Sequence, residues 1–367
     1  MDMIKAGFIG LGLIGGSLAK TIKRIYPESE VYACDKDTAA VDLAVSEGIV
    51  KTNMTHDEIT DPKFLPQLDY LFLCAPVITN IKILKRIMPK LGDMKLIVSD
   101  VGSVKTEIAA FAKENNITSF IGGHPMVGSE KTGFAASSDH MFENAYYILT
   151  TDMADEETFN SFSDFIASLG AIPVAIESGY HDFIMSGISH LPHFVAASLV
   201  NTVNETSGGA DIFKKLAAGG FKDITRIASS SPEMWSQIAL TNKDNILAEL
   251  DKCIESLNSI RSDIDKQDKE AIMDFFKKAG EYRNSIPNSG LGVLDATYSI
   301  YCDLADETGE IAKVAGLLAN AEISIKNIGI VHNREFRDGA LLIEFYDAES
   351  KDEALILLSD NKYTIYH

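Results

Sequence analysis

Two periods of apolar residues alternate along the first half of the chain. Short apolar runs typical of buried strands are followed by segments in which apolar residues recur every three or four positions, as on one face of a helix. The expected strands are 4–9, 31–34, 70–74, 95–98, 120–122, 146–150 and 172–175, and the expected helices are 13–22, 38–46, 79–88, 103–114 and 158–169. This alternation predicts a parallel, doubly wound α/β sheet.

The pattern changes twice after residue 175. From 179 to about 279 strand-like runs stop, and apolar stripes such as the one from Ile184 to Val195 predict long helices. We expect these stripes to form a core or an interface in a homodimer. From residue 298 the strands are expected at 298–304, 323–331, 340–346 and 363–366, and the helices at 310–319 and 352–358. This order, β-α-β-β-α-β, is that of a ferredoxin-like domain.

Three domains follow from these changes of pattern. We expect a nucleotide-binding domain over 1–178, a helical dimerisation or substrate domain over 179–284, a linker over 285–296 and a small domain over 297–367. The linker is suggested by the run Asn284–Gly290, which is rich in turn-forming residues. With 367 residues, of which 46% are hydrophobic, the chain is long enough to bury several cores.

Glycines at a strand-to-helix junction indicate a dinucleotide site. Gly10, Gly12 and Gly15 follow the first strand in the order G-x-G-x-x-G, and Leu13 and Ile14 begin the next helix. In a Rossmann-type domain the first glycine allows the turn, the second lets pyrophosphate approach the backbone, and the third lets helix and strand pack closely. The N–H groups of the first helical turn would meet the phosphates. A plain glycine turn is the alternative.

Two further strand ends complete the expected cofactor site. Asp35 ends the second strand, twenty-five residues after Gly10, near the spacing of about 20 typical of a ribose-binding carboxylate. It favours NAD over NADP, although Lys36 could weaken that preference, and a solvated strand end is the alternative. Ala75 and Pro76 follow the third strand, where ligands of such sheets bind.

The net charge limits the classes of partner that are expected, and the cysteine content indicates the compartment. The formal net charge is −20, which disfavours nucleic acid and anionic membranes as partners. The four cysteines have no C-x-x-C spacing, as expected in a reducing cytoplasm. We found no apolar stretch of the ~18 residues that suggest a membrane span, and we expect a soluble cytoplasmic protein. An anionic substrate would need local cations in so acidic a chain.

Two polar clusters of the first domain are candidates for chemistry. Residues 122–133, Gly-Gly-His-Pro-Met-Val-Gly-Ser-Glu-Lys-Thr-Gly, are too polar for a core, which favours a binding loop. His124 could act there as a base or be a structural histidine at a strand end. Ser103, in Asp-Val-Gly-Ser-Val-Lys, could hydrogen-bond to His124, cap a helix, or do both.

Two more clusters lie in the helical region. Ser189-His190-Leu191-Pro192-His193 places Ser189 and His193 on one helix face, and Pro192 is expected to bend the helix. No acid or cysteine stands at ligand spacing beside the two histidines, so we expect no metal there.

Residues 219–228 carry a cation on a glycine-led helix. Arg226 could hold a carboxylate through two hydrogen bonds, or form a salt bridge with Asp223 or Asp211. Trp235, the only tryptophan, is expected to be a packing anchor.

These motifs together resemble those of the prephenate dehydrogenases. The resemblance covers residues 4 to about 280 and rests on GLGLIGGSLA, DVGSVK, GGHPMVGSEKTG, SHLPH and GGFKDITRIASSSPEMW. Residues 298–367 resemble an ACT domain, a module that commonly binds amino acids at subunit interfaces. The arrangement is similar to that of the feedback-regulated bacterial members of the family.

The resemblance implies NAD-dependent oxidative decarboxylation of prephenate to 4-hydroxyphenylpyruvate, in tyrosine biosynthesis. It implies that His124 accepts the hydroxyl proton, that Ser103 orients His124, that Arg226 holds the ring carboxylate and that His193 lies near the substrate. The cavity wall would include Ser129, Glu130 and Lys222.

The resemblance also implies regulation by tyrosine through the C-terminal domain. The candidate contacts there are Asn327, Ile328 and Gly309.

Three other functions remain open. An arogenate dehydrogenase would use the amino analogue of prephenate, a β-hydroxyacid dehydrogenase would need a lysine base, and a non-catalytic sensor would bind NAD and an amino acid.

Overall fold

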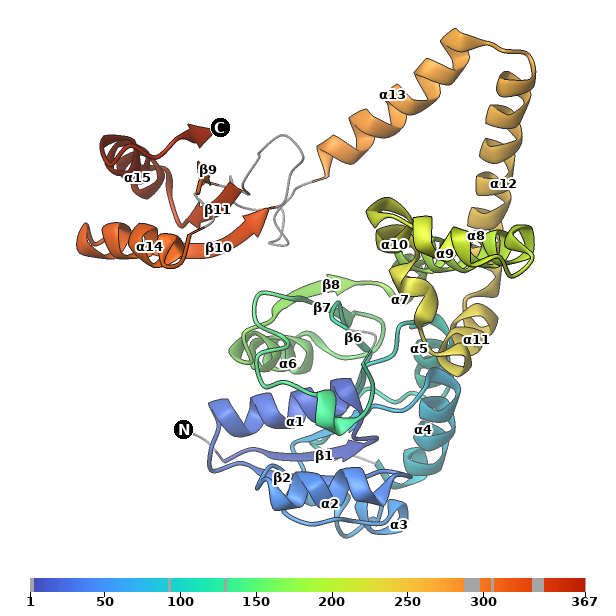
Figure 1. Cartoon of the computed structure of the whole chain (residues 1–367). Coiled ribbons are helices and arrows are strands. Elements are labelled where there is room, and N and C mark those ends of the chain that lie inside the picture. Colours follow the sequence, from blue (N-terminus) through green and yellow to red (C-terminus); the bar gives the residue numbers. More distant parts are fainter. Residues whose placement is uncertain are drawn as a thin grey trace. The chain divides into compact units, whose positions relative to one another are not determined.

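The computed structural model describes residues 3–91, 94–128, 131–286, 298–304, 307–331 and 340–366. The chain forms two compact units, Met1–Gly290 and Leu291–His367 (Figure 1). The linker expected at 285–296 falls mostly outside the described residues, and the preceding helix continues to Ser285.

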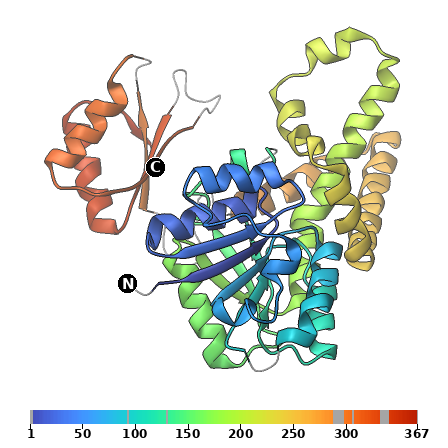
Figure 2. The same ribbon diagram turned by 90° about the horizontal axis from the view of Figure 1, so that it is seen from below.

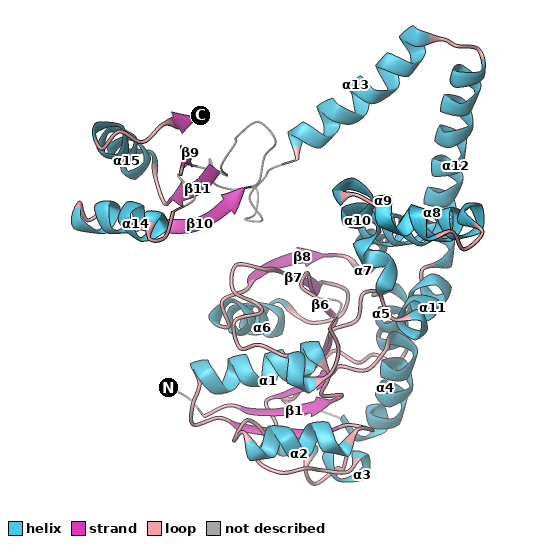
Figure 3. Cartoon of the chain, in the orientation of Figure 1, coloured by secondary structure: helices cyan, strands magenta, loops and turns pink. Residues whose placement is uncertain are grey.

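Five parallel strands form the main sheet of the first unit (Figure 3). They are β1 (Lys5–Ile9), β2 (Glu30–Cys34), β3 (Tyr70–Leu73), β4 (Ile97–Asp100) and β5 (Phe120–Ile121), in the spatial order β2-β1-β3-β4-β5. The order reverses between β1 and β3, and in such sheets the ligand crevice lies beyond the carboxyl ends of the strands at that point. The expected parallel, doubly wound sheet is confirmed for these five strands.

Alternate residues of each strand face two separate cores, because successive side chains of a strand point to opposite faces. Phe8 and Phe72 pack in one core with α1 (Leu13–Ile25) and α6 (Glu156–Ser168). Leu71 and Leu73 pack in the other core, with the long helices that follow β3 and β4. These are α4 (Val77–Leu91) and α5 (Thr106–Glu114). The remaining helical segments of this part are α2 (Thr38–Ser46), α3 (His56–Ile59), η1 (Leu65–Gln67) and η2 (Phe134–Ala136).

The last strands of this part do not extend the parallel sheet, contrary to expectation. A separate sheet has the order β6-β7-β8, in which β6 is antiparallel to β7 and β8 is parallel to it. Its strands are β6 (Gly123–Pro125), β7 (Tyr146–Thr150) and β8 (Ile172–Ile176). The chain turns from β5 into β6 through a single residue, Gly122, so His124 lies in a short strand rather than in the expected loop.

The rest of the first unit is helical (Figures 1 and 2). Its elements are α7 (Ser178–Met185), the π-helical turn η3 (Ser186–His190), α8 (Leu191–Ser207), α9 (Asp211–Leu216), α10 (Gly219–Thr225), η4 (Arg226–Ser229), α11 (Pro232–Thr241), α12 (Lys243–Asp265) and α13 (Lys269–Ser285). Val77 and Val104 pack against Ile238 and Ile246, which attaches α11 and α12 to the nucleotide-binding part. The π-helical turn ends two residues before Pro192, which has no N–H to donate to the carbonyl of Ile188 in a regular helix.

One helical stretch, Ser178–Ser207, is long and apolar enough to cross a membrane by length and composition alone. That differs from the expectation, which found no such stretch. The stretch contains His181, Asp182 and His190, whose side chains are fully buried within the protein. It is also interrupted by the π-helical turn. Polar groups held in hydrogen bonds to neighbouring elements favour a helix packed in protein over a membrane span.

The second unit is a four-stranded antiparallel sheet with two helices. Its elements are β9 (Tyr298–Asp303), α14 (Glu310–Asn320), β10 (Ile325–Val331), β11 (Ala340–Phe345), α15 (Ala348–Asp360) and β12 (Ile365–Tyr366). The spatial order β10-β11-β9-β12 confirms the βαββαβ arrangement. Apolar residues of both helices, such as Val314 and Leu358, pack with Ile300 and Ile343 of the sheet.

The first two glycines of the loop after β1 differ in what surrounds them. Gly10 has φ +100°, and a Cβ there would lie 2.8 Å from the carbonyl carbon of Cys74, so both its conformation and its contact require glycine. Gly12 has φ −80°, and a Cβ there would meet no protein atom within 4 Å. The backbone at Gly10 therefore meets the turn after β3, whereas Gly12 faces open space.

This contrast predicts opposite effects for two alanine substitutions. Gly10→Ala should lower the free energy of unfolding by about 1–3 kcal/mol, the usual cost of a non-glycine residue in such a conformation. Gly12→Ala should leave it within about 0.5 kcal/mol, yet weaken NAD binding because the methyl group fills the space beside the phosphates. Urea unfolding and NAD titration measure the two effects. Unchanged NAD affinity in Gly12→Ala would remove this loop from the cofactor site.

Candidate active site

The carboxylate of Asp35 is held beside the glycine loop. It accepts hydrogen bonds from the N–H of Leu11 at 2.5 Å and from the N–H of Asp37 at 2.8 Å. The side chain is half-buried at the end of β2, so further acceptor positions remain for the hydroxyls of a ribose. No acidic residue lies in the first turn of α1, which keeps the helix end favourable for phosphates.

A buried asparagine shapes the adjoining turn and was missed in the sequence. Asn80 is fully buried in α4; its Oδ1 accepts from the N–H of Ala75 at 3.1 Å and its Nδ2 donates to the carbonyl of Leu73 at 2.9 Å. These bonds hold Ala75 and Pro76 at the end of β3, against the backbone of Gly10. The glycine loop, the turn and Asp35 together fit a dinucleotide with an unmodified ribose.

His124 lies next to a second imidazole and a carboxylate. Its Nδ1 is 2.9 Å from Nε2 of His181, and Nδ1 of His181 is 2.7 Å from Oδ1 of Asp182. His181 and Asp182 belong to α7, so the helical part of the unit supplies the groups that hold the histidine of β6. Neither residue was singled out in the sequence, because only the fold brings α7 against β6.

The order of these bonds assigns the tautomers. A carboxylate accepts, so His181 donates its Nδ1–H to Asp182 and is left with a lone pair on Nε2. His124 then donates its Nδ1–H to that lone pair and keeps an unprotonated Nε2. Burial, the neighbouring His181 and the cation of Lys105 hold the pKa of His124 well below its ordinary 6.5. His124 is therefore a neutral proton acceptor at physiological pH.

Asp182 remains ionised although it is buried. Burial by itself would raise its pKa, but hydrogen bonds from His181 and Thr106 and from the N–H of Lys105 hold the pKa below the usual value. The N–H groups of Lys105 and Thr106 each donate to Asp182 at 2.8 Å, one to each carboxylate oxygen. The carboxylate of α7 thus caps the N-terminus of α5 from outside that helix.

Ser103 does not have either of the positions expected for it. Helix α5 begins at Thr106, so Ser103 precedes the helix and is not its cap. Among the described residues, no hydrogen bond joins Ser103 to His124, whose Nδ1 is bonded to His181 instead. The residues that orient His124 are His181 and Asp182.

A buried ion pair holds the backbone on the other side of His124. Lys105 and Asp100 are fully buried; Nζ of Lys105 donates to Asp100 at 2.5 Å and to the carbonyl of Gly123 at 2.7 Å. Asp100 in turn accepts from the N–H of Gly123 and of Gly102. The pair fixes the end of β4 to the residue immediately before His124.

His193 lies on α8 and packs against the only tryptophan. Its Nδ1 donates to the carbonyl of Ser189 at 2.9 Å, and its ring stacks on Trp235 with centroids 3.9 Å apart. Trp235 also packs against the apolar cluster that joins α11 and α12 to the nucleotide-binding part, as expected of an anchor. It therefore positions His193 as well as the helices.

The other expected substrate residues lie near α8 or outside the described residues. Arg226 begins η4 and is exposed, and Lys222 is exposed on α10; both elements pack against α8. Ser129 and Glu130 lie outside the described residues. Their roles, and those of Arg226 and Lys222, stay predictions.

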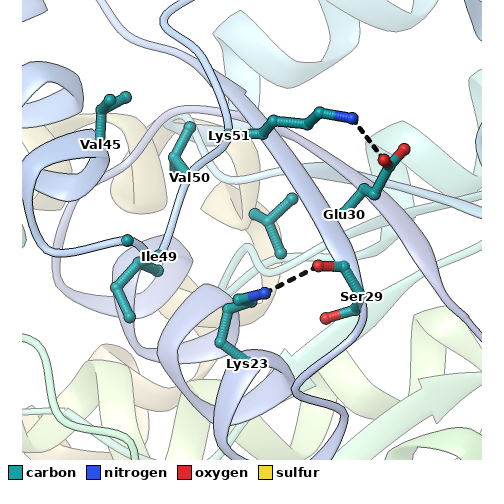
Figure 4. A pocket seen from close by; sticks show the side chains of 9 residues that line it. Lys23, Ser29, Glu30, Val45, Ile49, Val50 and Lys51 are labelled. Atoms are coloured by element: carbon teal, nitrogen blue, oxygen red, sulfur yellow. Dashed lines mark hydrogen bonds and ion pairs between the residues drawn. The ribbon is translucent and has the colours of Figure 1, made fainter.

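A hollow near the amino end of β2 is separate from this site (Figure 4). Its cations are engaged: Lys23 donates to the carbonyl of Ser29 at 2.9 Å, and Lys51 pairs with Glu30. Because Glu30 begins β2 and Asp35 follows its end, the hollow lies away from the edge where the glycine loop meets the turn after β3.

Comparison with known proteins is consistent with this geometry. Residues 18–174 match the family model described as "Prephenate dehydrogenase, nucleotide-binding domain", and 177–278 match "Prephenate dehydrogenase, dimerization domain". The prephenate dehydrogenase of Bacillus subtilis is 35% identical over 350 residues, which are 94% of this chain and 93% of that protein.

Two solved structures extend the comparison. The prephenate dehydrogenase of Aquifex aeolicus, in complex with hydroxyphenyl propionate and NAD+, has TM-score 0.70 and 30% identity over 78% of this chain and 99% of that one. The arogenate dehydrogenase of Synechocystis has TM-score 0.64 and 28% identity over 77% of this chain and 100% of that one. The chain therefore belongs to the prephenate dehydrogenase family.

Proposed function

We propose that this chain oxidises and decarboxylates prephenate to 4-hydroxyphenylpyruvate, with NAD as the hydride acceptor. The observation that carries the proposal is the neutral His124, held by His181 and Asp182 and left with a free Nε2 lone pair. The glycine loop and Asp35 provide the cofactor site. When bound, NAD supplies the hydride-accepting carbon.

His124 would take the proton of the substrate hydroxyl as the ring carbon beneath it loses hydride. The positive charge that forms on the imidazole is stabilised through His181 by the carboxylate of Asp182. Loss of the ring carboxylate as carbon dioxide then makes the ring aromatic, which drives the step without a metal. The electron pair of the broken bond ends on the C4 oxygen, and this phenolate takes the proton back from His124 to give the phenol. His181 and Asp182 act as positioning residues, since they reach the substrate only through His124.

The anionic groups of prephenate need cations or donors in a chain of net charge −20. We assign the ring carboxylate to Arg226, and we place His193, Lys222, Ser129 and Glu130 around the substrate. Support comes from the location of His193, Arg226 and Lys222 on α8 and on two elements that pack against it. Ser103 remains a candidate for contact with the substrate hydroxyl.

Arogenate is the second candidate substrate, because the Synechocystis arogenate dehydrogenase has the same fold over 77% of this chain. It differs from prephenate by an amino group in place of the keto group. Assay of both compounds with NAD and with NADP decides between the substrates and between the cofactors.

We infer that the second unit is an ACT domain that binds tyrosine and inhibits the enzyme. Asn327 and Ile328 lie on β10, and Gly309 precedes α14 with φ +96°. The amide of Asn327 donates to Glu344, which is only 4% exposed, at 3.0 Å. This fixed amide beside a buried carboxylate supports a polar ligand site on the sheet.

We also infer a cytoplasmic homodimer. The match to the dimerisation model supports the pairing, as do large apolar side chains exposed in the helical part, such as Ile254, Leu257 and Phe276. Ile254 and Leu257, which belong to an apolar stripe of α12 and are exposed, are therefore candidates for the dimer interface. The cysteines are present as free thiols, which fits a reducing compartment.

His124→Asn should keep NAD binding and lower kcat by about 10²–10⁴, the usual effect of losing a general base. In the wild-type enzyme, the acid limb of kcat/KM assigned to His124 should lie well below pH 6.5, because burial lowers its pKa. Prephenate-dependent NADH absorbance measures both. Wild-type turnover in the variant would exclude His124 as the proton acceptor.

Arg226→Ala should raise the KM for prephenate about tenfold or more, because a hydrogen-bonded charge contributes about 1.5–3 kcal/mol, and Arg226→Lys should be intermediate. Arg24→Ala is the matched control, since Arg24 pairs with Asp139 and Glu143 on the surface. An unchanged KM would assign Arg226 a structural role.

Tyrosine should bind the full-length protein and inhibit it, and Asn327→Ala should weaken that binding without changing kcat. Asn361→Ala is the control, because within the described part of the chain the side chain of Asn361 bonds to the end of its own helix and to no other element. Calorimetry that detects no heat of tyrosine binding would contradict the regulatory assignment.

A further inference from the structure

His190 is a fully buried histidine that the mechanism above does not use. It ends the π-helical turn between α7 and α8, and its exposed fraction is 0%. π-helical turns are rare, and many of those that do occur are found at functional sites. The sequence motif Ser-His-Leu-Pro-His drew attention to His193, whereas the structure shows that His190 is the more buried of the two.

The hydrogen bonds of Asn242 assign the tautomer of His190. Nδ2 of Asn242 donates to the carbonyl of Asp182 at 2.8 Å and lies 3.1 Å from Nδ1 of His190. Oδ1 of Asn242 accepts from Asn245 at 2.8 Å, so the amide cannot be turned around without losing two bonds. Nδ1 of His190 is therefore an acceptor, and the proton of the neutral ring lies on Nε2.

This Nε2–H has no acceptor among the described residues, although it is shielded from solvent. Buried donors are almost always paired in native proteins, with protein groups or with water, so an unpaired one requires an explanation. Burial lowers the pKa of His190 to about 4, so the ring is neutral at physiological pH and Nδ1 remains an acceptor.

A second unpaired donor lies on the neighbouring ring. Nε1–H of Trp235 is buried and has no acceptor in the described part of the chain. The rings of His190 and Trp235 meet edge to face with centroids 5.9 Å apart. His193, which stacks on the same indole, has the opposite tautomer from His190, because its Nδ1–H is used by Ser189. The region thus holds two unpaired donors.

The ring of His190 lies in the neighbourhood of the proton acceptor, His124. His181 and Asp182, which hold His124, belong to α7, the helix that leads into the turn ending at His190. The side chain of Asn242 contacts both the carbonyl of Asp182 and Nδ1 of His190. The imidazole of His190 is also among the groups that lower the pKa of His124, after burial, His181 and Lys105.

We propose that Nε2–H of His190 and Nε1–H of Trp235 form a two-donor site that binds carboxylate or carbonyl oxygens of the substrate. The proposal rests on the proposed function, in which His124 binds the C4 hydroxyl. Both carboxylates and the keto oxygen of prephenate are carried on C1, across the ring from that hydroxyl. Two neutral donors complement these substrate oxygens. His124 then contacts the hydroxyl at the opposite end of the ring.

Two variants of His190 separate this role from a structural one. Asparagine can keep an acceptor for Asn242 but does not reach the position of Nε2, whereas the longer glutamine can place an N–H there. His190→Asn should raise the KM for prephenate about tenfold or more, with a smaller change in kcat, and His190→Gln should recover most of the affinity. Trp235→Phe, which keeps an aromatic ring for stacking but removes the N–H donor together with part of the indole, should also raise KM.

His56→Asn is the matched control. His56 likewise has a buried Nδ1 without a partner, but it lies on α3 of the nucleotide-binding part. Its substitution should leave the KM for prephenate unchanged. An unchanged KM in His190→Asn would mean that the donor binds only water and would overturn the proposal. An equal rise in KM in both His190 variants, together with lowered thermal stability, would overturn it too. If His190→Asn does not fold, the KM of Trp235→Phe decides.

The fluorescence of Trp235 gives a readout that does not depend on turnover. It is the only tryptophan of the chain, so its emission reports this location alone. Adding 4-hydroxyphenylpropionate, an unreactive aromatic carboxylate, should change the emission, and His190→Asn should shift the titration to higher concentrations. No change with the wild-type protein would overturn the two-donor site. Absence of prephenate-dependent NADH formation would instead defeat the proposed function.

Discussion

The carboxylate of Asp182 is the group on which the arrangement of the site depends. It caps the N-terminus of α5 through the N–H groups of Lys105 and Thr106 and accepts from His181. One buried charge therefore joins the helical part to the nucleotide-binding part and sets the tautomer of two imidazoles in succession. Removing one partner of such a buried charge typically costs about 3–5 kcal/mol, so its position is maintained for stability as well as for chemistry.

The cofactor side and the substrate side of the site are built differently. On the cofactor side, the site is formed largely by backbone: the loop at Gly10 and Gly12 and the turn at Ala75 meet where the strand order reverses. On the expected substrate side, His181 of α7 contacts His124 of β6, and His193 of α8 stacks on Trp235 of α11. A backbone site needs glycines in a short motif, whereas a side-chain site needs distant segments to be brought together by packing.

The sequence predicted the five parallel strands and the βαββαβ unit well, because their apolar periods are strong and local. The prediction was wrong for the short strand that contains His124. Two glycines and a proline around that residue indicated a loop, yet backbone pairing with Tyr147 and Leu149 of β7 makes it a strand. Ser103 was expected to cap a helix because serine is a frequent cap, but the cap came from Asp182, about eighty residues away along the chain.

What the sequence determined by itself is the dinucleotide loop, the acid at the end of β2, the domain types and the family motifs, since each is a pattern within a few adjacent residues. What only the tertiary structure decided is which groups hold His124 and which buried donors remain unpaired. His181, Asp182, Asn242 and His190 are ordinary polar residues in an apolar helical region when read in order. Their roles arise from hydrogen-bond distances between segments, and such distances exist only after the helices have packed.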